Sequence, residues 1–284
     1  MALPRSVDLL NRTISRAGLR VTSGIAYGTE GRHLLDVYRP AKSRAALPVI
    51  VFFYGGSWQT GERADYRFAA ASLARRGYVV VVPDYRLYPA KYPAFLQDGA
   101  AAIAWVVKHV GEHGGDAEHI FLLGHSAGAY NAVMLALVPA FLQEQGVAPA
   151  RLAGVIGLSG PYDFLPLRDP VLQEIFSAPE EIRHTQPIIQ AHGAAPPMFL
   201  LTGGADKRVL PRNTAILAAR LRALGGVVET KVYPKLGHIG IILAMAPYFR
   251  WLAPVLHDVT AFCEACRAGD LSADRSGISF NMVG

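Results

Sequence analysis

The chain has 284 residues, of which 51% are hydrophobic and 18% are charged. This apolar content suffices for a large core and excludes an intrinsically disordered chain. The formal net charge is +6, but the basic residues are scattered and form no run or stripe with interleaved aromatic residues, so we expect no nucleic-acid partner.

The longest apolar runs are far shorter than the ~20 residues that a membrane-spanning helix needs, so we expect no membrane partner. The first residues contain no apolar run of signal-peptide length, which favours a cytoplasmic protein unless a leader peptide has been removed. Cys263 and Cys266 form a Cys-x-x-Cys motif late in a helical pattern. Without a second cysteine pair, we interpret them as two residues on one helix face rather than as a redox pair or half of a zinc site.

Segments with strand-like and helix-like patterns alternate along the chain. The predicted elements are, in order, strands at 33–40 and 48–54, a helix at 65–77, a strand at 78–85, a helix at 94–110, a strand at 119–124, a helix at 127–137, strands at 152–160 and 197–204, a helix at 213–225, a strand at 227–233 and a helix at 252–267. Strands that alternate with helices of this length indicate βαβ units. Because several strands are continuous runs of apolar residues, we predict a central, mostly parallel sheet with helices on both faces, in a single α/β domain spanning residues 1–284.

Two segments do not follow this alternation: residues 1–25 and residues 161–195. The second segment is interrupted by prolines, namely Pro161, Pro166, Pro170, Pro179 and Pro187. Long insertions over the ends of strands often form lids. We therefore predict a small cap built from these two segments.

The pentapeptide Gly-His-Ser-Ala-Gly occupies residues 124–128, between a predicted strand and a predicted helix. Glycines two residues before and two residues after a serine, in this context, are typical of a nucleophile elbow. The helix that follows directs its N-terminal N–H groups and its positive dipole end toward the serine. We therefore predict that Ser126 is a catalytic nucleophile.

A serine hydroxyl needs a base within hydrogen-bond distance, and after a nucleophile elbow the acid and the histidine follow the serine along the chain. His238 follows the predicted strand 227–233 closely, whereas His257 lies inside the last predicted helix. His125 adjoins Ser126 in sequence, and we expect its side chain to point elsewhere. These positions favour His238 as the base.

The acid is expected directly after a strand of the sheet, and two aspartates satisfy this condition. Asp206 follows the predicted strand 197–204 at the turn into the next helix, and Asp163 follows the strand before it. We prefer Asp206 as the acid, because Asp163 can also be explained as an acceptor for local backbone N–H groups.

Several motifs occur in the same order as in the α/β-hydrolase superfamily, and within it they resemble carboxylesterases related to hormone-sensitive lipase and the bacterial feruloyl-esterase-like group. The motifs are DVYRP, YGGSWQTG, VVVPDYRLYP, LQDGAAAIAWV, GHSAG, LLTGGADKRV and GHIG, between about residues 30 and 266. This resemblance implies an α/β-hydrolase fold and a triad of Ser126, Asp206 and His238. It also implies that the protein uses no metal and no organic cofactor.

The resemblance explains why the predicted strand 48–54 is followed by two glycines. In this family the loop after that strand contributes backbone N–H groups to the oxyanion hole, and only glycine lets the backbone approach the substrate carbonyl closely. The resemblance implies that Gly56 and Ser57 donate from this loop and that Gly55 permits the turn. The remaining donor is the N–H of Ala127, which directly follows the nucleophile.

Two residues of this loop region depart from the family's pattern. Tyr54 stands where the family has histidine, and Ser57 stands where one form of the motif has a third glycine. The resulting Gly-Gly-Ser-Trp sequence resembles a form of the motif that also occurs in kynurenine formamidases. An aryl formamide therefore stays open as an alternative substrate.

Four aromatic residues are predicted near strand ends, where they either line a substrate pocket or belong to the core: Trp58, Tyr130, Tyr162 and Phe164. Asp84 and Arg86, in the sequence Asp-Tyr-Arg-Leu, are interpreted as residues that brace their loop against its neighbours.

These features favour a serine carboxylesterase that hydrolyses small esters, with acyl chains of roughly two to eight carbons, through an acyl-enzyme intermediate. The alternatives are an arylformamidase or amidase that uses the same triad, and a non-catalytic hydrolase fold that binds ligands. The expected partner is a small-molecule ester, and a homodimer is left open.

Overall fold

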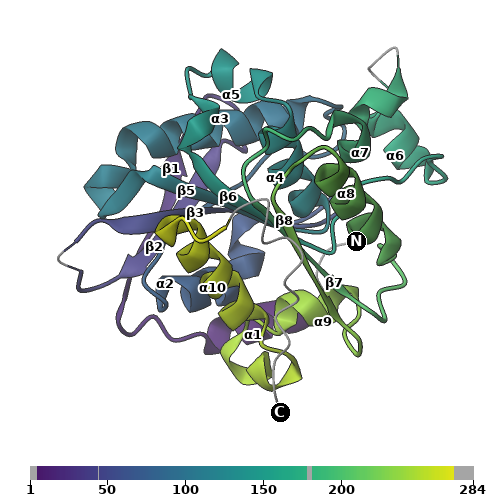
Figure 1. The fold of residues 1–284 in the computed structure, drawn as a ribbon. Coiled ribbons are helices and arrows are strands. Elements are labelled where there is room, and N and C mark those ends of the chain that lie inside the picture. Colours follow the sequence, from purple (N-terminus) through teal and green to yellow (C-terminus); the bar gives the residue numbers. More distant parts are fainter. Residues whose placement is uncertain (1–4, 44, 178–180, 272–284) are drawn as a thin grey trace.

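The computed structural model of the chain describes residues 5–43, 45–177 and 181–271. Its centre is an eight-stranded sheet with the strand order β1-β2-β4-β3-β5-β6-β7-β8 (Figure 1). The strands are β1 (Leu19–Ala26), β2 (Leu34–Pro40), β3 (Leu47–Phe53), β4 (Val79–Pro83), β5 (Gly115–His125), β6 (Leu152–Leu158), β7 (Met198–Gly203) and β8 (Val228–Tyr233). β2 pairs antiparallel with β1 and with β4, and all other neighbouring strands pair in parallel. The predicted, mostly parallel α/β sheet is therefore confirmed.

Helices cover both faces of this sheet (Figure 1). On one face, α2 (Arg67–Ala74) and α10 (Val255–Ala268) contact each other; on the other, α3 (Ala94–His109) packs beside α4 (Ala127–Leu137). The other helices are α1 (Arg5–Thr13), α5 (Ala140–Glu144), α6 (Pro170–Ile175), α7 (Pro187–Gln190), α8 (Arg212–Ala223) and α9 (His238–Leu243). Short 3₁₀ helices are η1 (Arg63–Tyr66), η2 (Val110–His113), η3 (Pro149–Arg151), η4 (Ile182–Thr185) and η5 (Pro247–Leu252).

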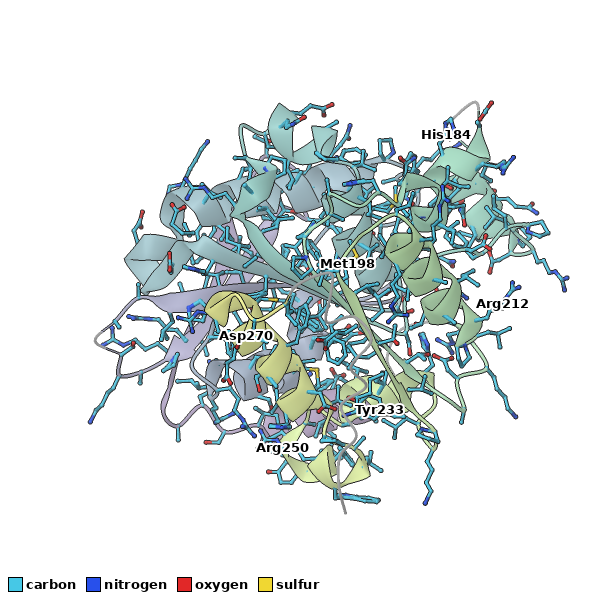
Figure 2. The ribbon with its side chains drawn as sticks, in the orientation of Figure 1. His184, Met198, Arg212, Tyr233, Arg250 and Asp270 are labelled. Atoms are coloured by element: carbon cyan, nitrogen blue, oxygen red, sulfur yellow. The ribbon has the colours of Figure 1, made fainter. Side chains whose placement is uncertain are left out.

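The central strands lie in the core because helices cover them on both sides. Every residue from Val49 to Phe53 in β3 and from Val79 to Val82 in β4 is completely buried. Such strands bury side chains on both faces and therefore read as continuous apolar runs rather than as alternating patterns. Arg212 and Arg250, by contrast, lie at the periphery of the molecule (Figure 2). Within the described part of the chain, none of the helices is both long enough and apolar enough to cross a membrane.

The prediction that residues 1–25 contribute to a cap is wrong for the described part of that segment. Its second half forms β1, an edge strand that pairs with β2, and α1 packs against η1 and α2. No residue of β1 is fully buried. The strand therefore lacks an apolar run, and only its hydrogen bonds with β2 identify it.

The insertion 161–195 begins at the carboxyl end of β6 and contains α6, η4 and α7 in its described parts. It is attached to α4 by a hydrogen bond of 2.6 Å from the hydroxyl of Tyr130 to the carbonyl oxygen of Thr185. A second attachment is the 2.7 Å hydrogen bond from the N–H of Tyr92 to the carbonyl oxygen of Ile175. The segment thus packs beside the helix that follows the serine elbow.

Cys263 and Cys266 lie on α10, as predicted, and both are free thiols. Burial raises the pKa of Cys266 to about 12 and the pKa of Cys263 well above its ordinary value. Thiolates are the reactive form of cysteine. These two side chains are therefore suited to packing rather than to redox chemistry.

Candidate active site

Ser126 stands in a strained turn between the last residue of β5 and the first residue of α4. Its φ is +56°, a left-handed conformation that is uncommon for residues other than glycine. The glycines two residues before and after Ser126 are required because neighbouring backbone approaches them closely. A Cβ on Gly124 would lie 2.1 Å from the carbonyl oxygen of Gly128, and a Cβ on Gly128 would lie 2.1 Å from the carbonyl oxygen of Phe53. The elbow therefore has no room for a side chain at either position.

The structure brings the three predicted triad residues into one hydrogen-bonded line. Nε2 of His238 lies 2.9 Å from Oγ of Ser126, and Nδ1 of His238 lies 2.8 Å from Oδ2 of Asp206. Because the carboxylate only accepts, Nδ1 of His238 carries the proton and Nε2 is free to accept the serine proton. The exposed fractions of Ser126, Asp206 and His238 are 8%, 2% and 8%. The line is thus shielded from bulk water.

Asp206 is held as an ionised carboxylate by its surroundings. Burial by itself would raise its pKa, but hydrogen bonds from His238 and from the backbone N–H groups of Val209 and Arg208 outweigh burial and lower the pKa. Oδ1 accepts both backbone N–H groups at 2.9 Å, which leaves Oδ2 for His238. A carboxylate in this state can orient the imidazole and stabilise the imidazolium that forms during proton transfer.

Asp163 does not take part in this line. Its backbone N–H donates to Oδ1 of Asn213 at 2.9 Å, and the residue lines a separate cavity formed by the insertion. The geometry therefore favours Asp206 over Asp163, and in the contact described here Asp163 donates its backbone N–H rather than accepting a local one.

The loop after β3 has an unusual backbone next to Ser126. Gly56 has a φ of +143°, and Ser57 and Trp58 have φ values of +54° and +57°. A Cβ on Gly56 would lie 1.9 Å from the carbonyl oxygen of Thr60, whereas a Cβ on Gly55 would lie 2.9 Å from Cβ of Ser126. Gly55 therefore has no room for a side chain because the loop presses against the elbow, whereas the resemblance implied that Gly55 permits the turn.

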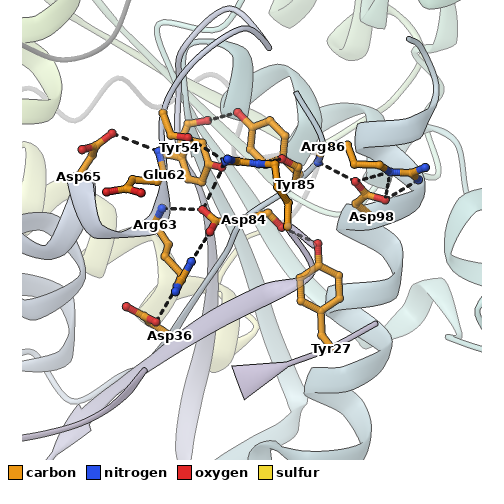
Figure 3. A network of polar contacts seen from close by, with 12 residues as sticks. Tyr27, Asp36, Tyr54, Glu62, Arg63, Asp65, Asp84, Tyr85, Arg86 and Asp98 are labelled. Atoms are coloured by element: carbon orange, nitrogen blue, oxygen red, sulfur yellow. Dashed lines mark hydrogen bonds and ion pairs between the residues drawn. The ribbon is translucent and has the colours of Figure 1, made fainter. Parts of the chain in front are cut away.

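Hydrogen bonds from Arg32 and Tyr85 hold the start of this loop in place (Figure 3). Nη2 of Arg32 donates to the hydroxyl of Tyr54 at 2.7 Å and to the carbonyl oxygen of Gly61 at 2.8 Å. The hydroxyl of Tyr85 donates to the carbonyl oxygen of Tyr54 at 2.7 Å. Tyr54 is thus hydrogen-bonded on both its side chain and its backbone, and both contacts fix the strand end from which the loop starts.

Asp84 contacts the same loop, whereas Arg86 contacts α3. Asp84 accepts the backbone N–H of Arg63 at 2.7 Å and also pairs with the Arg63 side chain, whose Nε lies 2.8 Å from Asp36 (Figure 3). Arg86 pairs instead with Asp98 on α3, at 2.6 Å. Both residues therefore brace the loop that contains them against its neighbours, Asp84 against Arg63 and Arg86 against Asp98 on α3, as the sequence predicted.

A small cavity opens beside Ser126. The lining residues are Gly55, Gly56, Ser57, Thr60, Gly61, Asp65, Tyr66, His125, Ser126, Arg208, His238 and Ile239. None of the four aromatic residues predicted as pocket residues belongs to this lining, and their contact with substrate stays a prediction. Trp58, Tyr130, Tyr162 and Phe164 lie elsewhere, and three of them are almost completely buried.

Trp58 anchors the loop after β3 to the core. Its exposed fraction is 2%, and its indole N–H donates to Oδ1 of Asn131 on α4 at 2.9 Å. Its ring packs edge-on against Tyr130 and Phe176, at centroid distances of 5.1 and 5.0 Å. This anchoring holds the left-handed residues of the loop in place, because strained backbone persists only where its surroundings determine it. The local sequence did not predict a structural role for Asn131, because its partner Trp58 lies 73 residues away along the chain. The same holds for Tyr66, whose hydroxyl is hydrogen-bonded to His125, 59 residues away.

A serine elbow after β5, an acid after β7 and a histidine after β8, on this strand order, define an α/β-hydrolase fold. The chain belongs to the BD-FAE family, whose family model matches residues 35–221. Two solved structures show the same fold. Esterase B of Lactobacillus rhamnosis gives a TM-score of 0.81 at 21% identity, covering 93% of each chain. Esterase 2 of Thermogutta terrifontis gives 0.72 at 24% identity, covering 92% of this chain and 98% of that one.

Curated relatives are longer than this chain. Esterase LipC of Mycobacterium tuberculosis is 31% identical over 223 residues, which cover 70% of this chain and 55% of LipC. Isoprenylcysteine alpha-carbonyl methylesterase ICME of Arabidopsis thaliana is 28% identical over 246 residues, which cover 79% of this chain and 58% of that protein. The chain thus spans little more than half the length of these relatives.

Proposed function

We propose that the protein is a serine carboxylesterase in which Ser126 is the nucleophile, His238 the general base and Asp206 the orienting acid. The observation that carries this proposal is the buried line from Asp206 through His238 to Oγ of Ser126, with hydrogen bonds of 2.8 and 2.9 Å. The relatives that are named esterases and the structures of esterases with the same fold support the same reaction class.

In the proposed reaction, Oγ of Ser126 attacks the ester carbonyl while Nε2 of His238 takes the hydroxyl proton. The imidazolium then donates this proton to the leaving alcohol, and an acyl-enzyme remains. Water repeats the sequence and releases the acid. Asp206 holds Nδ1–H throughout and stabilises the positive charge on His238.

The negative charge on the carbonyl oxygen needs donors on the other side of Ser126. Ala127 is the first residue of α4, so its N–H has no acceptor inside the helix and points toward the reacting centre. Gly56 and Ser57 line the cavity beside Ser126, and we assign their backbone N–H groups as the other donors. Gly55 is not assigned as a donor, because its N–H donates to the hydroxyl of Tyr66 at 3.1 Å.

The substrates that fit this site best are esters with short acyl chains, because the cavity beside Ser126 is small and closely lined. We also propose that the chain forms one domain, whose cap is the insertion between β6 and β7. A cytoplasmic location stays a prediction from the sequence.

The decisive assay compares p-nitrophenyl acetate, butyrate, octanoate and palmitate with N-formylkynurenine on the purified protein. We expect the highest kcat/KM on acetate or butyrate, a lower value on palmitate, and labelling by a fluorophosphonate probe. A higher kcat/KM on N-formylkynurenine than on any ester would make the protein an arylformamidase. A chain that neither turns over substrate nor reacts with the probe would be a non-catalytic hydrolase fold.

Gly56→Val tests the assigned oxyanion loop. The valine Cβ cannot occupy a site 1.9 Å from the carbonyl oxygen of Thr60, so the loop must move and its donors must leave the carbonyl. Since one lost oxyanion donor reduces kcat by about 10²–10³-fold, we expect a loss of at least about 10³-fold. Ser57→Ala keeps the backbone N–H and should lower kcat by less than about tenfold.

Gly77→Val is the matched control, because it also places a valine at a position with a positive φ. Gly77 also has a positive φ, +93°, but a Cβ there would meet no atom within 4 Å. The residue precedes β4 at the amino end of the strand, whereas the loop with Gly56 leaves the carboxyl end of the parallel strand β3. The kcat of Gly77→Val per folded molecule should equal that of the wild type. Full activity in folded Gly56→Val would show that the donors lie elsewhere.

A further inference from the structure

A chain of hydrogen bonds passes behind Ser126 and joins the two loops that carry the proposed machinery. The backbone N–H of Gly55 donates to the hydroxyl oxygen of Tyr66 at 3.1 Å. That hydroxyl lies 3.1 Å from Nδ1 of His125. Nε2 of His125 lies 3.0 Å from the backbone carbonyl oxygen of His238. This series of hydrogen bonds therefore begins in the loop after β3 and ends at His238, the first residue of α9.

The partners determine where each proton lies. A backbone carbonyl only accepts, so Nε2 of His125 must carry a proton. In a neutral imidazole Nδ1 is then the acceptor, and the Tyr66 hydroxyl must donate to it. The same hydroxyl oxygen accepts from Gly55. Each donor in this series of hydrogen bonds thus faces one acceptor. No other arrangement of protons on a neutral His125 satisfies all three contacts.

Both side chains that link the two loops, Tyr66 and His125, are buried and neutral. Tyr66 and His125 are 2% and 1% exposed. Burial, followed by the nearby His238, lowers the pKa of His125 to about 3, and burial raises the pKa of Tyr66. The Tyr66 ring packs against Phe52 and Phe68 at centroid distances of 5.4 and 6.0 Å.

The neutrality of His125 has a consequence for the reaction. Its ring centroid lies 5.0 Å from that of His238, which becomes an imidazolium while the serine proton is held. A charged His125 at this distance would oppose that imidazolium. A neutral histidine can donate to the His238 backbone without this electrostatic penalty.

We propose that Tyr66 and His125 are positioning residues that hold the oxyanion loop and the backbone of His238 at a fixed separation around Ser126. The two loops come from opposite sides of the nucleophile, and a displacement of about 1 Å between reacting groups can cost about 10²-fold in rate. This inference rests on the proposed esterase function, because the separation matters only if both loops act on one substrate.

Tyr66→Phe removes the hydroxyl and keeps the ring packing. We expect kcat on p-nitrophenyl butyrate to fall by about ten- to a hundredfold, with KM changed by less than about twofold. The matched control is Tyr78→Phe. Tyr78 is also 2% exposed, and its hydroxyl also forms a buried hydrogen bond, in this case to the backbone carbonyl oxygen of Thr260. Tyr78 directly precedes β4 and so lies at the amino end of that strand, whereas Ser126 follows the carboxyl end of β5. The kcat of Tyr78→Phe should equal that of the wild type at a similar loss of thermal stability.

A double-mutant cycle of Tyr66→Phe and His125→Phe tests whether the two residues act together as one hydrogen-bonded connection or independently. Because either substitution breaks the same series of hydrogen bonds, kcat of the double variant should be no lower than that of the less active single variant. The hydrogen bonds of His125 can be tested independently of enzyme activity by ¹⁵N NMR of its imidazole. We expect a neutral ring protonated at Nε2 near pH 6, with a changed Nδ1 signal in Tyr66→Phe.

The outcomes separate this inference from the proposed function. A wild-type protein that hydrolyses none of the esters would refute the esterase function, and the positioning role with it. An active wild type would refute the positioning role alone if Tyr66→Phe had the kcat of Tyr78→Phe, if the losses multiplied in the double variant, or if His125 carried its proton on Nδ1.

Discussion

Ser126→Ala is expected to reduce kcat on p-nitrophenyl butyrate by about 10⁶-fold and to abolish labelling by a fluorophosphonate. Oγ of Ser126 is the atom that lies 2.9 Å from Nε2 of His238 and faces the cavity beside the elbow. Without it no acyl-enzyme can form, and the remaining donors can only polarise a carbonyl for slow attack by water. Turnover, probe labelling and thermal unfolding of the purified variant measure the effect.

Ser159→Ala is a matched control for this substitution. Ser159 is another serine with a left-handed backbone, at a φ of +49°, and it is completely buried directly after β6. Its hydroxyl has no hydrogen-bond partner among the described residues, and it does not line the cavity at Ser126. This variant should keep wild-type kcat. Wild-type turnover in folded Ser126→Ala would refute the assignment of the nucleophile.

Asp206→Asn is expected to lower kcat by about 10⁴-fold while the protein stays folded. An asparagine amide can present an N–H group to His238, which favours the tautomer with the proton on Nε2. That nitrogen then has no free lone pair for the serine proton. The substitution also removes the negative charge that stabilises the imidazolium. The loss should appear mainly in kcat, since Asp206 is 2% exposed and does not line the cavity.

Asp163→Asn is the control for the second aspartate that the sequence offered. Asp163 lies within the insertion and is absent from the hydrogen bonds of His238. Its substitution should change kcat by less than about twofold, because changes away from such features usually alter free energies by no more than about 0.5 kcal/mol. The reverse ranking of the two variants would move the acid to Asp163.

The choice between these aspartates illustrates where sequence reasoning ends. Both residues follow a strand, so the local pattern gave only a preference for Asp206, and the strand order supplies the physical reason. In the sheet, β7 lies next to β8, and Gly203 is paired with Tyr233 in register. The turns that leave these two strand ends therefore meet, and they carry Asp206 and His238. β6, which precedes Asp163, lies between β5 and β7 and is not adjacent to β8.

The fold class was predictable wherever a local pattern is strong. Runs such as Val49 to Phe53 are apolar because the strand is covered on both faces, and that pattern identifies it without any partner. β1 gave no such signal, because none of its residues is fully buried and its pairing with β2 is the contact that defines it. The same weakness led residues 1–25 to be assigned to a cap.

By itself, the sequence determined the alternation of strands and helices, the serine elbow and the glycine pair beside it. Each of these depends on residues within a few positions of one another. Only the tertiary structure decided which groups hold them in place. Tyr66 and His125 are 59 residues apart, and His125 and His238 are 113 apart, yet each pair is joined by a hydrogen bond. Such contacts leave no periodic trace along the chain, because they arise only when separate strand ends are brought to the same edge of the sheet.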